Sequence, residues 1–151
     1  LGMRTLDVLR GVDLLNSRDD LKGRKIVTIG EGLGGLWALL ASVYDSRING
    51  VVTIGTLPSY MILLTNKYYN VWGYFFVPGA LYDFDIPDMA RLVSPNPQIW
   101  LDPVDALGEK MDITNASLII GSSKNLQILT SENKSSQEIY SIINRSLNQG
   151  K

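Results

Sequence analysis

The chain has 151 residues and contains neither histidine nor cysteine. Imidazole is the usual base that takes the proton from a catalytic hydroxyl, because its pKa lies near neutrality. Serine–histidine catalysis therefore cannot be completed by this chain alone. The absence of cysteine excludes disulfides and thiolate metal sites, although it leaves the cellular compartment open. No set of residues has metal-ligand spacing, so we expect no metal and no cofactor.

Strong net charge is also absent, since the formal net charge is −1 with acids and bases interspersed. This excludes the basic surface of a nucleic-acid-binding protein and the polybasic segment of a membrane anchor. The longest apolar run falls short of the roughly 18 residues that a transmembrane helix needs. We expect no nucleic-acid or membrane partner. The length and the 45% apolar content suit a single domain over residues 1–151.

No secretory leader precedes the first amphipathic pattern, and the chain begins with leucine rather than methionine. We therefore interpret it as an excised or mature segment of a parent protein. The residues leave its localisation unknown, and a secreted or periplasmic bacterial parent fits the resemblance described below.

Glycines gather between an apolar run at 25–29 and an apolar helical pattern, in the sequence Gly-Glu-Gly-Leu-Gly-Gly at 30–35. This has the backbone form of the Gly-x-Ser-x-Gly nucleophile elbow, with Gly32 where the serine should stand. An elbow needs flanking glycines because its central residue sits in a strained turn and the backbones pack closely. The pattern predicts a sharp bend between strand and helix that lacks a nucleophile.

Apolar runs alternate with helical patterns along the chain, which predicts an α/β fold with a mainly parallel sheet of about four strands in three αβα layers. The first helix should bury a stripe of Leu6, Leu9, Val12 and Leu15. The expected elements are a helix over 3–16, a strand over 25–29, a helix over 36–42, a strand over 51–54, a helix over 85–93, a strand over 98–101, a helix over 112–120, a strand over 126–129 and a helix from 135.

Most aromatic residues lie in an insert at about 60–84, inside the second strand–helix unit. Flat rings stack on sugars or on apolar acyl groups, so Tyr60, Trp72 and Tyr74 are candidate substrate-binding residues. The alternative is a cap that packs on the sheet edge or on a neighbouring domain.

The same glycines also match Gly-x-Gly-x-x-Gly at Gly30, Gly32 and Gly35, which suggests a nucleotide-binding module. The acidic ribose ligand expected about 20 residues further on is missing, because the next strand ends in Ile54, Gly55 and Thr56. Asp102 and Asp105 follow the third strand, where ligand groups gather in open α/β sheets. They can equally be loop aspartates bonded to nearby amides.

Taken together, these segments resemble the C-terminal half of an α/β-hydrolase of the acetyl xylan esterase and dienelactone hydrolase type. The closest likeness is to the second, degenerate domain of bacterial proteins that carry two such domains in tandem. The resemblance extends over about residues 1–111. The segments that carry it are 1–9, 30–36, 44–48, 57–60, 77–81, 84–88, 94–97 and 101–105.

The resemblance implies that Gly32 stands at the nucleophile position, that Leu33 offers one oxyanion-hole amide, and that Asp105 is the triad acid. The base would follow the last strand, within 130–134, where this chain offers only Thr, Ser, Glu, Asn and Lys. The second oxyanion donor would come from a loop on the N-terminal side of the fold, outside this chain. The family consists of carboxylic ester hydrolases, but two of the three triad positions depart from its pattern.

The resemblance also implies a family sheet of about eight strands, of which this chain supplies roughly the last four. The strand Lys25 to Ile29 would then be an edge with unpaired amides and carbonyls. We expect it to pair with the missing N-terminal half, with another chain or in a homo-oligomer.

These observations favour a catalytically inactive domain, structural or carbohydrate-contacting, within a larger protein. The first alternative is a fragment of an ester hydrolase whose catalytic residues lie outside this chain. The second is the nucleotide-binding module.

Overall fold

The computed structural model describes residues 1–70, 76–93 and 95–148. Its four strands form one all-parallel sheet in the order β1–β2–β3–β4. The strands are β1 (Ile26–Glu31), β2 (Ile48–Ile54), β3 (Gln98–Leu101) and β4 (Leu126–Leu129). Because the strands are parallel, their carboxyl ends meet at one edge of the sheet. The predicted α/β fold is confirmed.

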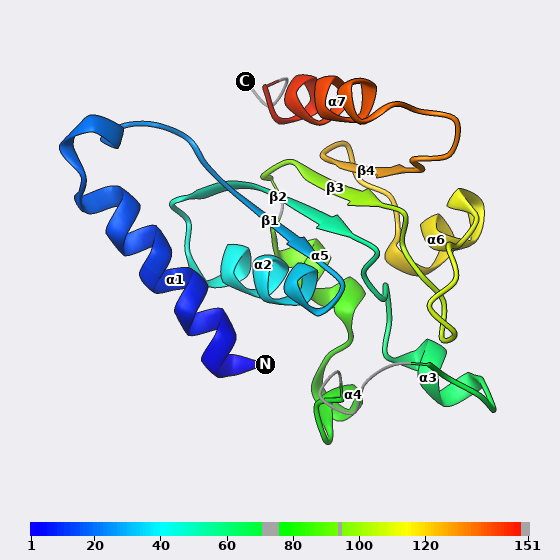
Figure 1. The fold of residues 1–151 in the computed structure, drawn as a ribbon. Helices are drawn as coiled ribbons and strands as arrows, with labels where there is room; N and C mark the ends of the chain where they lie inside the picture. Colours follow the sequence, from blue (N-terminus) through cyan, green and yellow to red (C-terminus); the bar gives the residue numbers. More distant parts are fainter. Residues whose placement is uncertain (71–75, 94, 149–151) are drawn as a thin grey trace.

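Helices cover both faces of the sheet and make three layers (Figure 1). α2 (Leu33–Tyr44), α5 (Ile86–Val93) and α6 (Ile113–Ile120) lie on one face, and α7 (Ser136–Asn148) lies on the other. α1 (Gly2–Ser17) packs beside α2 and leads through a short 3₁₀ turn, η1 (Asp19–Leu21), into β1. The insert between β2 and α5 contains the short helices α3 (Met61–Thr65) and α4 (Ala80–Asp83).

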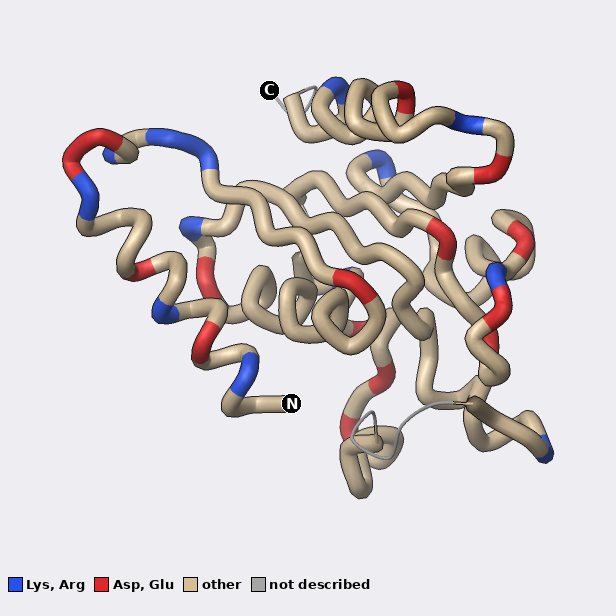
Figure 2. Tube along the Cα trace, in the orientation of Figure 1, with Lys and Arg blue, Asp and Glu red and all other residues tan. Residues whose placement is uncertain are grey.

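The main core lies between the sheet and the helix layer formed by α2, α5 and α6. α2 has no charged residue, as Figure 2 shows, and both Leu36 and Leu39 are fully buried in it. They share this core with Val51, Trp100 and other side chains, namely Ile86, Met89, Ala116 and Ile120. On the other face, Leu147 of α7 reaches Gly50 of β2, where a Cβ atom would lie 2.8 Å from the leucine methyl carbon.

The stripe predicted on α1 is only partly buried. Val12 is buried in a small cluster with Ala41 and Ile48, but Leu6 and Leu15 remain 47% and 40% exposed. α1 packs along α2, and α1 turns its row of Thr5 and Val12 toward α2. Leu6 and Leu15 flank that row. The three-residue spacing of apolar side chains therefore predicted the helix correctly but not which of its faces packs on another element.

The second strand begins earlier than the sequence predicted, at Ile48 rather than at Val51. Asn49 is an extra residue in β2, because Ile26 pairs with Ile48 while Val27 pairs with Gly50. The Asn49 side-chain oxygen accepts a hydrogen bond from the Ile26 amide at 3.0 Å. The Asn-Gly pair at 49–50 therefore has the composition of a turn but lies in the first part of a strand with a bulge.

Candidate functional site

A single residue, Gly32, separates the end of β1 from the start of α2. Its φ of 53° and ψ of −119° lie in a region that residues with a side chain rarely adopt. The Gly32 amide donates to the Ile54 carbonyl at 2.8 Å, and the Thr56 hydroxyl donates to the Gly32 carbonyl at 3.0 Å. The predicted sharp bend is confirmed, and it has the strand–turn–helix form that a nucleophile elbow requires.

The two flanking glycines are required by close packing. A Cβ atom on Gly30 would lie 2.1 Å from the carbonyl oxygen of Gly34, and one on Gly35 would lie 2.0 Å from the Thr56 hydroxyl oxygen. By contrast, a Cβ on Gly32 would meet no atom within 4 Å. The bend therefore offers open space at the place where an elbow presents its nucleophile.

Leu33 is the first residue of α2, so the helix provides no acceptor for its amide. The dipole of α2 also favours negative charge at this end. Beside it lies a cavity of about 520 Å³ lined by Leu1, Arg4, Glu31, Leu33, Gly34 and Trp37. The oxyanion role of Leu33 stays a prediction.

Asp102, at the carboxyl end of β3, connects the loops that follow β3 and β4. It has a left-handed φ of 48° and is 9% exposed. Its carboxylate accepts hydrogen bonds from the Ser131 amide at 2.8 Å and from the Ser131 hydroxyl, and Lys110 Nζ lies 2.9 Å away. Lys110 also donates to the Ser131 hydroxyl at 2.7 Å. Burial raises the pKa of Asp102, but these hydrogen bonds and the lysine outweigh it, so the net pKa is lowered.

Asp105, the predicted triad acid, caps its own loop. Its carboxylate accepts from the amides of Leu107 at 2.8 Å and Glu109 at 3.0 Å. These contacts fit the loop-aspartate interpretation, and the triad role stays a prediction. Asp102 is the carboxylate that contacts the predicted base segment 130–134. The two aspartates have the same position signal in the sequence, whereas the structure separates them by the positive φ and the hydrogen-bond partners of Asp102.

The base segment lies far from the bend. β4 is separated from β1 by β2 and β3, a distance of about 14 Å at the usual strand spacing. Only the short connector 130–135 follows β4, and within it Lys134 Nζ donates to the Thr130 carbonyl. The hydrogen bonds that the segment 130–134 makes within the described residues go to Asp102, to Lys110 and to other atoms of the segment itself.

Tyr60 is a core residue rather than an exposed stacking platform. It is 5% exposed, and burial, with a smaller effect of Asp85, raises the pKa of its phenol to about 12. Its ring lines an apolar cavity of about 530 Å³ between α3 and α4, together with Met61, Leu63, Leu64, Phe76, Val77, Pro78, Gly79, Ala80, Leu81 and Tyr82. Trp72 and Tyr74 lie outside the described residues, so their predicted role stays a prediction.

No group of three or more acidic side chains in the described part of the chain could hold a metal ion, and histidine and cysteine are absent from the sequence. No described helix combines the length and apolarity needed to span a bilayer.

Solved structures of hydrolases share this fold. A "putative acetyl xylan esterase" from Bacteroides fragilis superposes with a TM-score of 0.58 at 16% identity, covering 88% of this chain and 36% of its own. The 2,6-dihydroxy-pseudo-oxynicotine hydrolase superposes with a TM-score of 0.60 at 16% identity, covering 97% of this chain and 44% of its own. An esterase of Pyrococcus furiosus superposes with a TM-score of 0.56 at 17% identity, covering 97% of this chain and 59% of its own. At these identities the likeness shows the fold, which is of the α/β-hydrolase type.

A relative was also found by sequence. The Bacillus subtilis strain 168 protein named "Putative hydrolase YtaP" is 30% identical over 101 residues, which are 66% of this chain. The chain spans about a third of that relative, 34% of its length. No protein-family model matches the chain. The sequence likeness supports a relationship with hydrolases of this type.

The first prediction concerns the packing of the bend. Gly30→Ala should lower the free energy of unfolding by about 1–3 kcal/mol, because the backbone of α2 must move away from the new methyl group. Gly34→Ala is the matched control, since a Cβ there meets nothing within 4 Å, and it should be neutral or stabilising. Urea denaturation of both variants measures the difference, and equal midpoints would contradict the packing argument.

The second prediction concerns the central residue of the bend. Gly32→Ser should fold with a strain of about 1–3 kcal/mol from its positive φ, and should hydrolyse no ester. Gly32→Ala has the same strain without a hydroxyl and is the control. Rapid turnover by Gly32→Ser would show that a base lies within reach of residue 32.

The third prediction concerns Asp102. Its folded-state pKa is lowered, so its contribution to stability is present above the unfolded pKa of about 4 and is lost as the pH falls through the folded pKa. Asp102→Asn should lower the free energy of unfolding at pH 7 by about 1–3 kcal/mol, with a smaller deficit at pH 3. Asp7→Asn, at an exposed carboxylate on α1, is the control. A deficit that is independent of pH would refute the assignment.

Proposed function

We propose that this chain is a catalytically inactive α/β-hydrolase-like domain that serves as a structural or carbohydrate-contacting module of a larger protein. The observation that carries the proposal is the bend at Gly32. It keeps the backbone geometry and the space of a nucleophile elbow, but its residue has no side chain. A scaffold of this kind can persist without its chemistry, because Gly30 and Gly35 allow β1 and α2 to pack closely whether or not a reactive side chain is present.

The charges at the carboxyl edge of the sheet support the inactive interpretation. A working triad needs a carboxylate that orients a base, but the Asp102 carboxylate is already occupied by Ser131 and Lys110. The sequence contains no histidine that could serve as that base.

A role as a module is supported by the length of the relatives. The chain matches 34% of the Bacillus protein and 36–59% of the three solved structures. The carbohydrate contact rests on the aromatic insert. Among its described residues, Tyr68, Tyr69 and Tyr82 expose 70%, 53% and 96% of their surface, so these rings can stack on a sugar, whereas Tyr60 is buried.

A second candidate is an ester hydrolase that is completed by residues outside this chain. The cavity beside Leu33 favours it, because this open space adjoins a helix-terminal amide that can stabilise an oxyanion. In that case a nucleophile and a base must both enter the cavity from another segment.

The deciding measurement is the hydrolysis of acetyl esters, with p-nitrophenyl acetate and acetylated xylan as substrates. We expect the rate with purified protein to equal the rate with Gly32→Ala and with heat-unfolded protein. Turnover that disappears at the same temperature as the folded structure would belong to this chain and would contradict the proposal. A contaminating esterase would lose activity at its own temperature instead.

Thermal shift separates the remaining alternatives. A nucleotide that binds the folded state would raise the Tm. We expect no change in Tm with NAD or ATP at millimolar concentration. A saturable rise with either nucleotide would instead favour the nucleotide-binding module. A rise with xylo-oligosaccharides that is lost on Tyr82→Ala would favour carbohydrate contact over a purely structural role.

A further inference from the structure

The insert between β2 and α5 is nearly free of charge. From Ile48 to Tyr82 the sequence contains one charged residue, Lys67, and in Figure 2 the chain around α3 is tan apart from one blue stretch. Met61, Leu64 and Phe76 nevertheless expose 48%, 70% and 38% of their surface. Clusters of exposed apolar side chains mark interaction or ligand-binding sites.

These three side chains line one cavity, the apolar space of about 530 Å³ between α3 and α4. We call it the α3–α4 cavity. Its volume lies within the range of about 300–1,000 Å³ that is usual for small-molecule sites. None of its described lining residues also lines the cavity beside Leu33, so it is separate from the bend at Gly32.

Hydrogen bonds and packing fix the two helices that bound the α3–α4 cavity. The Asp85 carboxylate accepts from the Tyr60 amide at 2.7 Å and from the Ser59 hydroxyl, which ties the start of the insert to its end. Leu63 of α3 and Ala80 of α4 are both buried in the main core. The cavity is therefore largely pre-formed, and a ligand need not order its walls.

The wall of the cavity consists almost entirely of carbon atoms. No described lining residue is charged, and the amides of Leu63, Ala80 and Tyr82 are bonded to carbonyl groups within the insert. The Tyr60 hydroxyl is shielded from solvent, so the carbon atoms of its ring form the wall. A sugar or a charged group would lose its water here without gaining hydrogen-bond partners.

The length of the walls favours a small molecule over a peptide. α3 has five residues and α4 has four, which correspond to about 7.5 Å and 6 Å of helix. A helix that binds in a groove uses anchors from i to i+7, which extend over about 10 Å. The described part of the insert also contains no strand whose edge could pair with an extended peptide.

The side chains of the wall favour an aliphatic chain over a flat ring. The Phe76 ring already contacts Tyr69 edge-to-face, with centroids 5.5 Å apart at 66°. The Tyr60 ring is packed in the main core. Most of the other contacts come from aliphatic side chains such as Val77 and Leu81. A ring ligand needs a free aromatic face for stacking, whereas a flexible chain can pack on these side chains.

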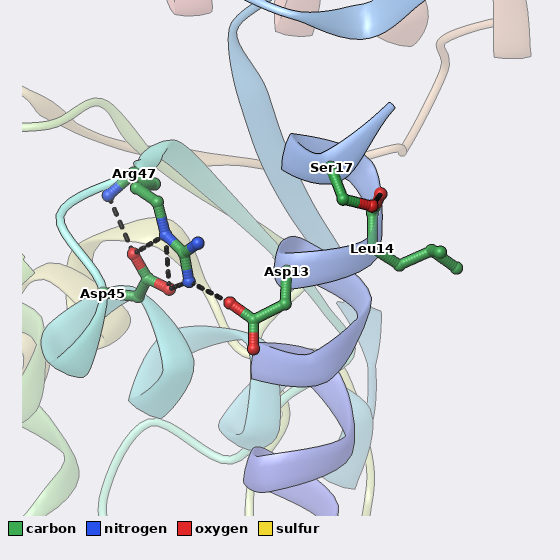
Figure 3. A network of polar contacts seen from close by, with 5 residues as sticks. All are labelled: Asp13, Leu14, Ser17, Asp45 and Arg47. Carbon is green, nitrogen blue, oxygen red and sulfur yellow. Dashed lines mark hydrogen bonds and ion pairs between the residues drawn. The ribbon is translucent and has the colours of Figure 1, made fainter. Parts of the chain in front are cut away.

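The exposed leucines of α1 do not form a comparable site, because charged residues interrupt the apolar pattern of this helix. Arg47 bridges Asp13 of α1 at 2.6 Å and Asp45 at 2.6 Å (Figure 3). Leu14 directly follows Asp13 in the sequence. An apolar ligand on Leu14 would therefore have to remove water from these ion pairs.

We propose that the α3–α4 cavity binds the aliphatic chain of a small amphiphile, whose polar head stays in solvent beyond Met61 and Leu64. This binding is independent of whether the domain is catalytic. It also differs from a sugar stacked on the exposed ring of Tyr82, because the chain occupies the interior of the cavity.

Fluorescence titration of the purified chain with N-phenyl-1-naphthylamine, an uncharged apolar dye, tests the proposal. We expect a saturable rise in emission. Octyl β-glucoside below its micelle concentration should reverse this rise, whereas methyl β-glucoside, which has the same head without the chain, should not. Emission that does not saturate, or glucosides that compete equally or not at all, would overturn the proposal.

A pair of variants assigns the binding to the α3–α4 cavity. Leu64→Asp should leave the Tm unchanged, because the side chain is 70% exposed, and should raise the Kd of octyl β-glucoside by about 10-fold or more, because the bound chain removes water from the carboxylate. Leu118→Asp on α6, at a side chain 79% exposed outside the cavity, should change neither quantity. An equal Kd for the two variants would contradict the assignment.

Methyl resonances of the unmodified protein give a readout that depends on no variant. On addition of octyl β-glucoside, the signals of Leu63, Val77 and Leu81 should shift, and those of Leu39 and Val51 in the main core should stay in place. If the three cavity signals stay in place at concentrations that displace the dye, the chain binds elsewhere and the proposal is wrong.

Discussion

The close approach of β1 to the first turn of α2 is the constraint on which the rest of the structure depends. It is possible only because Gly30 and Gly35 have no side chains where the Gly34 carbonyl and the Thr56 hydroxyl lie. It brings the uncharged helix α2 flat against β1 and β2, so that Leu36 and Leu39 reach the core. It also forces Gly32 into its positive φ and directs this residue to open space. Packing and the unusual backbone conformation therefore have one cause.

The sequence predicted the order of elements well, because apolar runs ended by glycine or proline are strong local signals. It failed where the outcome depends on partners. The stripe on α1 could not reveal that Thr5 and Val12 are the buried residues of this helix. Asn49 could not be recognised as a bulge, because its role depends on the Ile26 amide in another strand. Asp102 and Asp105 differ through loop conformation, which composition does not encode.

The candidate site was predictable to a similar extent. The glycine spacing gave the bend and the position of Gly32, since both follow from local backbone geometry. The separation between the bend and the segment 130–134 depends on sheet order and on the length of one connector. Residue types alone therefore identified the absence of histidine and of a side chain at Gly32, whereas the sheet order shows that two strands lie between β1 and β4.

The hydrogen bonds of Asp102 have a consequence for how the two loops tolerate substitution. Its carboxylate is engaged by a main-chain amide as well as by side chains, so replacing Ser131 or Lys110 alone would not free it. The link between the loops that follow β3 and β4 therefore persists through a single substitution at either partner.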